Sequence, residues 1–405
     1  MTQSFPWPQH PHQTLVGPAD DIVVVGGGVA SHRCLFDLRR HGYRGNLTLI
    51  SEELYLPYDR TLLSKDMLEE DVLVEPFLLS DATEYRAAGI DLHLGVKATW
   101  LDTSQRRIGL NDGTSRPFDR LVLAVGGSPV LPPDLDVPGV LVVRQAAGLD
   151  NLRRAMSAGG RMVVIGGGFI GGEVATAAVK HDMEVTLVEA AAQPLAPVFG
   201  EDVGQRVATL HRENGVTVRC GSAATTISAN PSGYVVELND GSSLEADSVV
   251  VGVGMRPNTD WILDSGIEID RGIITDSICQ TSCASVFAAG DCARWWHPGY
   301  AELCRVEHWD TANRHGAAVA KAVAGERQEF APVPFFWSTQ HGIRFQFAGR
   351  TASWDDIRIN DESTNQFSAC YYTAGVLTGA LVVNQPRVFA RLRRELGMGM
   401  VKVKA

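Results

Sequence analysis

The sequence has no apolar run that approaches the roughly 20 residues needed to span a bilayer, which excludes a membrane-spanning role. It also has no basic excess: the formal net charge of −11 over 405 residues argues against nucleic acid as a general partner. The first 20 residues hold four prolines but neither a basic stretch nor an apolar core, unlike a signal peptide. We therefore expect 1–19 to be a flexible extension and the protein to be cytoplasmic.

Cysteine is scarce and irregularly spaced. No CxxC pair and no His/Cys cluster with zinc spacing occurs, so we expect no metal site. The cysteines are Cys34, Cys220, Cys279, Cys283, Cys292, Cys304 and Cys370. Cys279 and Cys283 form a CxxxC, but no base lies near them in the sequence. We interpret all seven as reduced thiols that pack as small apolar side chains.

A glycine-rich strand–turn–helix signature is present twice. The first copy, IVVVGGGVAS, spans 22–31 and is followed by Glu52 after the next apolar run. The second, MVVIGGGFIG, spans 162–171 and is followed in the same way by Glu189. In a dinucleotide-binding βαβ unit the glycines permit a tight turn and close approach to a pyrophosphate, and the acid reaches a ribose hydroxyl. Two copies predict two bound dinucleotides and electron transfer between them.

The repeat extends beyond the glycines. An LNDG hairpin turn at 110–113 precedes an apolar strand that ends at Gly126, and a second LNDG at 238–241 precedes another that ends at Gly254. This pattern predicts an α/β chain with two nested Rossmann-like dinucleotide-binding domains. We expect one domain at 20–147 and 248–325, with the other inserted at 148–247.

The character of the chain changes after about residue 326. Runs at 334–340, 345–349 and 380–384 predict strands of an antiparallel sheet, and Pro386 opens a last helix. We therefore expect a smaller α+β domain at 326–405.

Five further segments stand out: PYDRTLLSK at 57–65, GGGFIGGE at 166–173, GMRPN at 254–258, FAAGD at 287–291 and FWS at 336–338. Together with the first glycine motif, they make the chain resemble the FAD-containing, NADH-dependent ferredoxin reductases of bacterial oxygenase systems, a family related to apoptosis-inducing factor. The resemblance covers about 20–400 and implies a glutathione-reductase-like fold; PYDRTLLSK and FAAGD are its most specific segments.

The resemblance implies an FAD site and an NAD site. The implied FAD contacts are Gly26, Gly28, Val29, Ala30, Glu52, Glu53, Arg60, Lys65, Ala98, Asp291, Glu307, His308, Trp309 and Trp337. Glu52 is favoured over Glu53 as the ribose ligand. The implied NAD contacts are Gly167, Gly168, Phe169, Ile170, Gly171, Glu189 and Gly254, and Gly166 belongs to the same turn. Glu189 predicts NADH over NADPH, since the next residues, AAAQ at 190–193, include no Arg or Lys to neutralise a 2′-phosphate.

Two residues are implied to be catalytic. Lys65 is placed by the resemblance near flavin N5, and Glu173 is placed at the nicotinamide site as the partner of Lys65. The chain departs from the family at three positions. Ser31 replaces the third motif glycine or alanine, and Ser128 and Val130 stand where an arginine is usual, so one cationic FAD contact is missing.

We expect hydride transfer from NADH to FAD, followed by single-electron transfer to a small iron–sulfur ferredoxin that supplies a P450 or a ring-hydroxylating oxygenase. The chain has no cluster-ligand spacing of its own. Four arginines of the last helix are candidates for ferredoxin docking: Arg387, Arg391, Arg393 and Arg394. The alternatives are a flavin disulfide reductase or NADH oxidase, which needs a reactive cysteine, and an NADH-responsive flavoprotein of the apoptosis-inducing-factor type.

Overall fold

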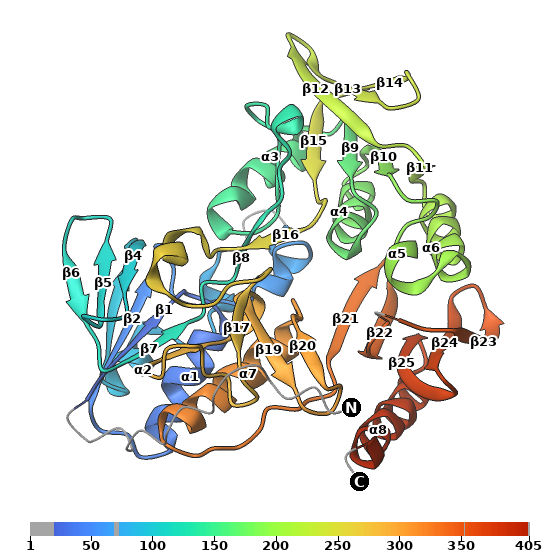
Figure 1. Ribbon diagram of the computed structural model, residues 1–405. Helices are drawn as coiled ribbons and strands as arrows, with labels where there is room; N and C mark the ends of the chain where they lie inside the picture. Colours follow the sequence, from blue (N-terminus) through green and yellow to red (C-terminus); the bar gives the residue numbers. More distant parts are fainter. Residues whose placement is uncertain (1–19, 69–72, 352, 404–405) are drawn as a thin grey trace.

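The computed structural model describes residues 20–68, 73–351 and 353–403, so the extension expected at 1–19 lies outside the described residues. Figure 1 shows three bodies: two α/β bodies, and a third built on an antiparallel sheet near the C-terminus. Within the described residues, no helix combines the length and the apolar character needed to cross a membrane.

The first body holds a five-stranded parallel sheet in the order β18-β7-β1-β2-β3. Its strands are β1 (Asp21–Val25), β2 (Asn46–Ser51), β3 (Ile90–Leu94), β7 (Arg120–Leu123) and β18 (Val286–Ala288). The central strands are continuous apolar runs because both faces of the sheet are covered. Since β18 pairs with β7 more than 160 residues later in the chain, the second body is inserted into the first.

Helices α1 (Val29–Arg40) and α7 (Trp309–Val323) pack together on one face of this sheet, with α2 (Ala82–Ala87) nearby. Short strands surround the body in three small sheets. They are β4 (Ala98–Asp102), β5 (Arg107–Leu110) and β6 (Ser115–Pro117); β8 (Gly127–Pro129) with β16 (Met255–Pro257); and β17 (Ile273–Thr275), β19 (Ala293–His297) and β20 (Glu302–Cys304).

The second body repeats the plan with a parallel sheet in the order β11-β10-β9-β15. Its strands are β9 (Arg161–Ile165), β10 (Glu184–Glu189), β11 (Thr217–Cys220) and β15 (Ser248–Val251). Its helices are α3 (Leu149–Ala158), α4 (Phe169–Lys180), α5 (Ala196–Phe199) and α6 (Glu201–Glu213). An antiparallel insertion, β12 (Ala224–Asn230), β13 (Gly233–Leu238) and β14 (Ser243–Ala246), extends away from it in Figure 1. Each LNDG sequence turns a hairpin, β5–β6 in one body and β13–β14 in the other.

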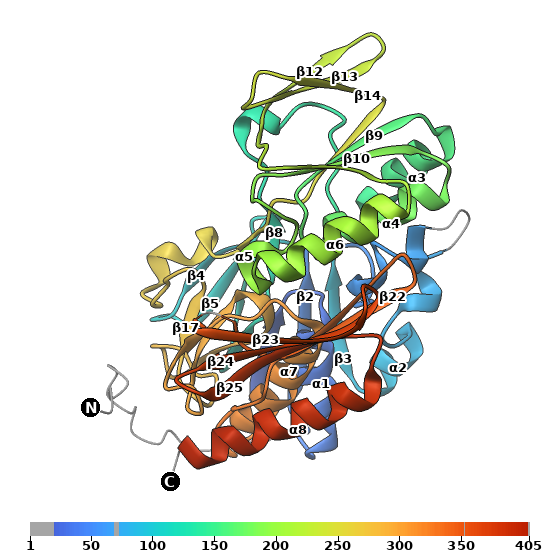
Figure 2. The same cartoon turned by 90° about the vertical axis from the view of Figure 1, so that its right-hand side faces the viewer.

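The third body is an antiparallel sheet in the order β21-β22-β25-β24-β23, followed by α8 (Pro386–Val403). The strands are β21 (Phe335–Gln340), β22 (Ile343–Gly349), β23 (Asp356–Ser363), β24 (Gln366–Thr373) and β25 (Val376–Val383). Alternate residues point to opposite faces, so Phe345, Phe347 and Leu381 pack on α5 and α6, whereas Ala348 and Val382 pack on α8. Figure 2 shows α8 lying along the sheet. The predicted fold class is confirmed; strands β23 and β24 were not predicted from the sequence.

Candidate active site

The first glycine turn directs the start of α1 into a cavity. Gly26 has a φ of +114°, and its N–H donates to the carbonyl oxygen of Ile50 at 2.8 Å. A Cβ at Gly26 would collide with the carbonyl of Ala124, so only glycine fits there. Gly28 is the N-cap of α1, and the space where its Cβ would lie is open. A helix N-terminus with free amides is thereby presented to a ligand.

A cavity of about 490 Å³ lies in front of this turn. Its wall contains most of the residues implied to contact FAD: Gly26, Gly28, Val29, Ala30, Glu52, Glu53, Arg60, Ala98, Asp291, Glu307 and Trp309. The remaining three, Lys65, His308 and Trp337, line a neighbouring cavity instead. The roles of these residues as FAD ligands stay a prediction.

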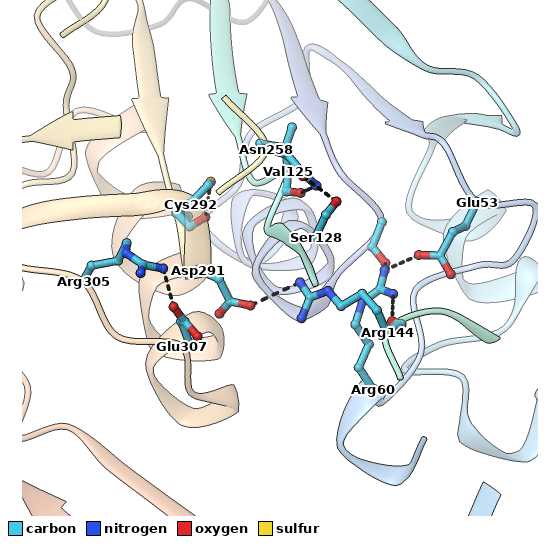
Figure 3. Close-up of polar contacts among 12 residues, drawn as sticks. Glu53, Arg60, Val125, Ser128, Arg144, Asn258, Asp291, Cys292, Arg305 and Glu307 are labelled. Carbon is cyan, nitrogen blue, oxygen red and sulfur yellow. Dashed lines mark hydrogen bonds and ion pairs between the residues drawn. The ribbon is translucent and has the colours of Figure 1, made fainter. Parts of the chain in front are cut away.

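Arg144 is a cation of this cavity that the sequence analysis missed. Its Nη2 lies 3.3 Å from Asp291 Oδ2, and its carbonyl oxygen accepts a hydrogen bond from Arg60 Nη1 at 3.1 Å. Figure 3 shows the two guanidinium groups near each other. Ser128, which stands where an arginine was expected, donates instead to Asn258 at 2.7 Å. A guanidinium pair beside a helix N-terminus suits a pyrophosphate, so this donor set fits FAD.

The two candidate ribose ligands differ in what they already bind. Glu53 is nearly buried, accepts from the Tyr58 hydroxyl at 2.7 Å and is paired with Arg60. Glu52 is about half exposed, and its described partner is Lys97 at 3.2 Å. Glu52 therefore has the freer carboxylate, which favours it as the ribose ligand. Glu53 holds Arg60 in place.

The second glycine turn has the same geometry, and an acidic side chain is hydrogen-bonded to its backbone. Gly166 has a φ of +110°, its N–H donates to the carbonyl of Val188 at 2.8 Å, and a Cβ would meet the carbonyl of Gly252. The Glu189 carboxylate accepts from the N–H of Gly167 and from that of Ala191, each at 2.7 Å. These amides fix the carboxylate at the edge of the turn.

A second cavity of about 840 Å³ opens here. Of the residues implied to contact NAD, its wall contains Gly168, Phe169, Ile170, Glu189 and Gly254. Gly167 and Gly171 do not line it. Gly167 donates to Glu189, and Gly171 lies where a Cβ would collide with the carbonyl of Gly166, so it permits close helix–strand packing.

The two cavities share a wall, which includes Arg60, Arg144, Asp291 and Trp309. Lys65 and Glu173 face the second cavity beside this wall, and Lys65 Nζ lies 2.7 Å from Glu173 Oε2. Lys65 comes from the first body and Glu173 from α4 of the second. The ion pair thus joins the two bodies at the border between the cavities.

The start of α7 supplies polar atoms without protein partners. Among the described residues, His308 Nδ1 and Trp309 Nε1 are buried and unpaired, and both residues line a cavity. Burial lowers the pKa of His308 to about 4, so its ring is neutral near pH 7. Burial raises the pKa of Glu307, against the opposing effect of Arg305. Trp337 packs on Trp309, with ring centroids 6.2 Å apart. Unpaired polar atoms on a cavity wall suit a ligand with a polar ring system.

No cysteine lines either cavity in the part of the chain that the structure describes. All seven are free, and Cys292, next to Asp291, is buried with a pKa raised by burial to about 12. Cys34 lies on α1 and Cys279 is fully buried. Within the same residues, no group of three or more His, Cys, Asp or Glu is arranged to hold a metal ion.

Comparison with known proteins agrees with this geometry. The profile of the pyridine nucleotide-disulphide oxidoreductases matches 20–316, and a reductase C-terminal family matches 335–404. The chain belongs to the pyridine nucleotide-disulphide oxidoreductase family. This confirms the resemblance on which the sequence analysis relied.

Named relatives of this oxidoreductase lie at about one-third identity. Rhodocoxin reductase of Rhodococcus erythropolis is 34% identical over 94% of this chain and 90% of its own. The ferredoxin–NAD(+) reductase subunit of the benzene 1,2-dioxygenase system of Pseudomonas putida is 35% identical over 82% of this chain and 81% of its own. The putidaredoxin reductase chain of a covalent complex with putidaredoxin superposes with a TM-score of 0.89, at 31% identity over 93% of both chains.

Proposed function

We propose that this protein is an FAD-containing NADH:ferredoxin reductase that supplies electrons to a P450 or another oxygenase through a small iron–sulfur protein. One observation carries the proposal: two cavities of about 490 and 840 Å³, each bordered by a glycine turn, share a wall that no cysteine of the described residues lines. The named relatives are reductases of ferredoxin-dependent systems. When bound, FAD accepts a hydride from NADH and releases electrons singly.

The protein's own residues bind, orient and shield the two cofactors. Arg60 and Arg144 hold the FAD pyrophosphate, and Glu52 its adenosine ribose. Glu189 accepts from the NADH ribose and repels a 2′-phosphate, because its carboxylate is fixed by two amides and no Arg or Lys occurs at 190–193. Lys65 and Glu173 form an ion pair at the border between the two cavities, where they would orient the flavin and nicotinamide rings.

The partner docks, in this proposal, on the arginine-rich face of α8. Arg387, Arg391 and Arg394 are exposed there. Arg393 is partly buried and lies over the Phe335 ring, 4.5 Å from its centroid, and Phe335 stacks on Trp337 at 5.6 Å. A chain of side-chain contacts therefore runs from the cavity wall to this helix. A protein with acidic surface would be steered there.

That no cysteine of the described residues lines a cavity weighs against a disulfide reductase or a thiol-dependent NADH oxidase, since those reactions need a thiolate at the flavin. A redox-responsive protein of the apoptosis-inducing-factor type would use the same cavities but turn over slowly. All seven thiols being free also fits the reducing cytoplasm in which we place the protein.

The test is direct. Purified protein should be yellow, and with a [2Fe–2S] ferredoxin it should reduce cytochrome c rapidly with NADH, and far less with NADPH. Blocking accessible thiols should not change the rate. A colourless protein after FAD reconstitution would refute the proposal, whereas slow turnover with a long-lived NADH complex would favour the redox-responsive alternative.

The docking face can be tested by charge reversal. Arg391→Glu with Arg394→Glu should raise KM for the ferredoxin about tenfold at low salt and leave NADH reduction of a small dye unchanged. Arg154→Glu, on an exposed position of α3, is the matched control. Rates that do not depend on salt, or equal effects at α3 and α8, would remove this face from consideration.

A further inference from the structure

The Glu173 carboxylate is held by all three bodies at once. Its Oε2 accepts from Ser64 and from Lys65, both in the segment that follows β2 in the first body. Its Oε1 accepts from Ser338 Oγ of β21 at 2.6 Å. Ser64, Glu173 and Ser338 are each at most 4% exposed. Water is therefore largely excluded, and each carboxylate oxygen depends on a protein donor.

Strand β21 and helix α4 meet in register along this contact. Residues 336, 338 and 340 share one face of the strand, while 169, 172–173 and 176 share one face of the helix. Phe336 packs on Phe169 with ring centroids 4.7 Å apart, and Ser338 binds Glu173. The side chain of Gln340 fills the space where a Cβ of Gly172 would lie. The N–H of His341 then donates to Thr176 Oγ1 at 3.3 Å.

Ser338 acts from behind the cavity. It does not appear in the wall of either cavity, whereas Glu173 lines the second one. We propose that Ser338 is a positioning residue: through it the C-terminal sheet holds the Glu173–Lys65 pair in the orientation that flavin reduction requires. The inference rests on the proposed function and extends it, because it makes the third body part of the NADH half-reaction.

Loss of the Ser338 hydroxyl would leave Glu173 Oε1 buried without a donor. A hydrogen bond to a charged group is worth more than a neutral one, and a buried unpaired carboxylate oxygen is costly. We expect the carboxylate to rotate toward other donors and to draw Lys65 with it. The rate of the chemical step should then fall, while pyrophosphate and ribose contacts of the nucleotide stay intact.

The experiment compares three variants of the FAD-loaded protein with the wild type by anaerobic rapid mixing with NADH and by titration with NAD+. Ser338→Ala should slow flavin bleaching about tenfold and change the Kd for NAD+ less than threefold. Ser338→Cys, which keeps the volume and a weak donor, should give an intermediate rate. Thr339→Ala, exposed on the same strand, is the matched control and should resemble the wild type.

A double-mutant cycle shows whether Ser338 acts through Glu173. In a Glu173→Gln background, Ser338→Ala should lose most of its effect on the bleaching rate, and the two changes should be non-additive in thermal unfolding as well. A full tenfold effect in that background, or wild-type rates for Ser338→Ala, would overturn the inference. If Ser338→Ala fails to fold, the same criteria apply to Ser338→Cys. Wild-type protein that NADH does not bleach would instead refute the proposed function.

Discussion

The two glycine turns superimpose in pattern but differ at the residue that closes each turn. Val25 pairs with Ile50 in the first body and Ile165 with Val188 in the second, so Ser51 occupies the place of Glu189. Glu189 caps the Gly167 amide, whereas Ser51 is buried beside Gly27 and the first acid follows one residue later. The second turn therefore has a carboxylate acceptor, that of Glu189, already held in place by backbone amides. In the proposed FAD site, the exposed Glu52 and the cations Arg60 and Arg144 line the cavity beside the first turn.

This difference matches what each site must do. A nucleotide that binds and leaves in every turnover is selected by a fixed carboxylate that needs no rearrangement. A cofactor that stays bound can be held by many weaker contacts spread over the cavity wall. The duplicated fold is therefore specialised at one position of the strand that follows each turn.

Breaking each turn in isolation should have the largest effect. Gly26→Ala should yield colourless protein, because the methyl group meets the Ala124 carbonyl at a φ that alanine avoids. Gly166→Ala should stay yellow, yet lose at least about a hundredfold in kcat/KM for NADH, with the barrier raised by roughly 3 kcal/mol. Absorption spectra and steady-state kinetics measure both. A yellow, fully active Gly26→Ala protein would show that the first turn does not hold FAD.

The two acids should differ in the next experiment. Glu189→Gln should reduce kcat/KM for NADH about tenfold, because a carboxylate that two amides fix is replaced by a neutral amide. The difference in kcat/KM between NADH and NADPH should therefore become smaller. Glu52→Gln should accelerate FAD release only about threefold, since Glu52 is half exposed and paired with Lys97. Equal effects would mean that both acids serve the same way. An unchanged ratio of kcat/KM for NADH to kcat/KM for NADPH in Glu189→Gln would contradict the role given to Glu189.

Local patterns explain how much could be predicted from the sequence. The glycine turns, the LNDG hairpins and the FAAGD segment at the end of β18 are each encoded within about ten consecutive residues, so their spacing reveals them. Strands β23 and β24 were missed because their pairing depends on neighbours in the third sheet. Pro386, which was expected to open the last helix, is the first residue of α8.

Tertiary contacts explain the rest of the site. Arg144 lies between β8 and α3 outside any motif, and its partner Asp291 is 147 residues away. Ser338 meets Glu173 across 165 residues. No periodicity in the chain predicts either contact, because both arise only when segments far apart in the sequence fold together. The departures at Ser128 and Val130 suggested a missing cation; the structure shows that Arg144 brings one to the same cavity.

Two histidines, His32 of the first body and His211 of the second, should both make the protein less stable in acid. Only His211 also contacts the third body. His32 lies 3.0 Å from the Tyr85 hydroxyl within the first body, while His211 of α6 lies 2.9 Å from His341 of the third. Burial lowers the pKa of all three to about 4. The unfolded chain therefore takes up these protons first, and stability falls as pH drops from about 6.5 to about 4.

Denaturation measured between about pH 6.5 and about pH 4 distinguishes the roles of His32 and His211. His32→Gln and His211→Gln should each reduce the number of protons taken up on unfolding at pH 5 by about one, which flattens the slope of stability against pH by roughly 1.4 kcal/mol per pH unit. Only His211→Gln should also loosen the third body, seen as earlier proteolysis near β21. An unchanged pH slope in both variants would show that these histidines are protonated in the folded protein.

The smallest effect concerns the third position of each glycine motif. Ser31 is fully buried, and its hydroxyl has no hydrogen-bond partner among the described residues. Ser31→Ala removes that unpaired group and should stabilise the protein by about 1 kcal/mol. At the matching position, Gly171→Ala should destabilise it, because the new Cβ would meet the Gly166 carbonyl. Urea denaturation measures both changes. If Ser31→Ala were destabilising instead, the hydroxyl would have to bind a buried water, and the first copy would tolerate a side chain at this position only through that water.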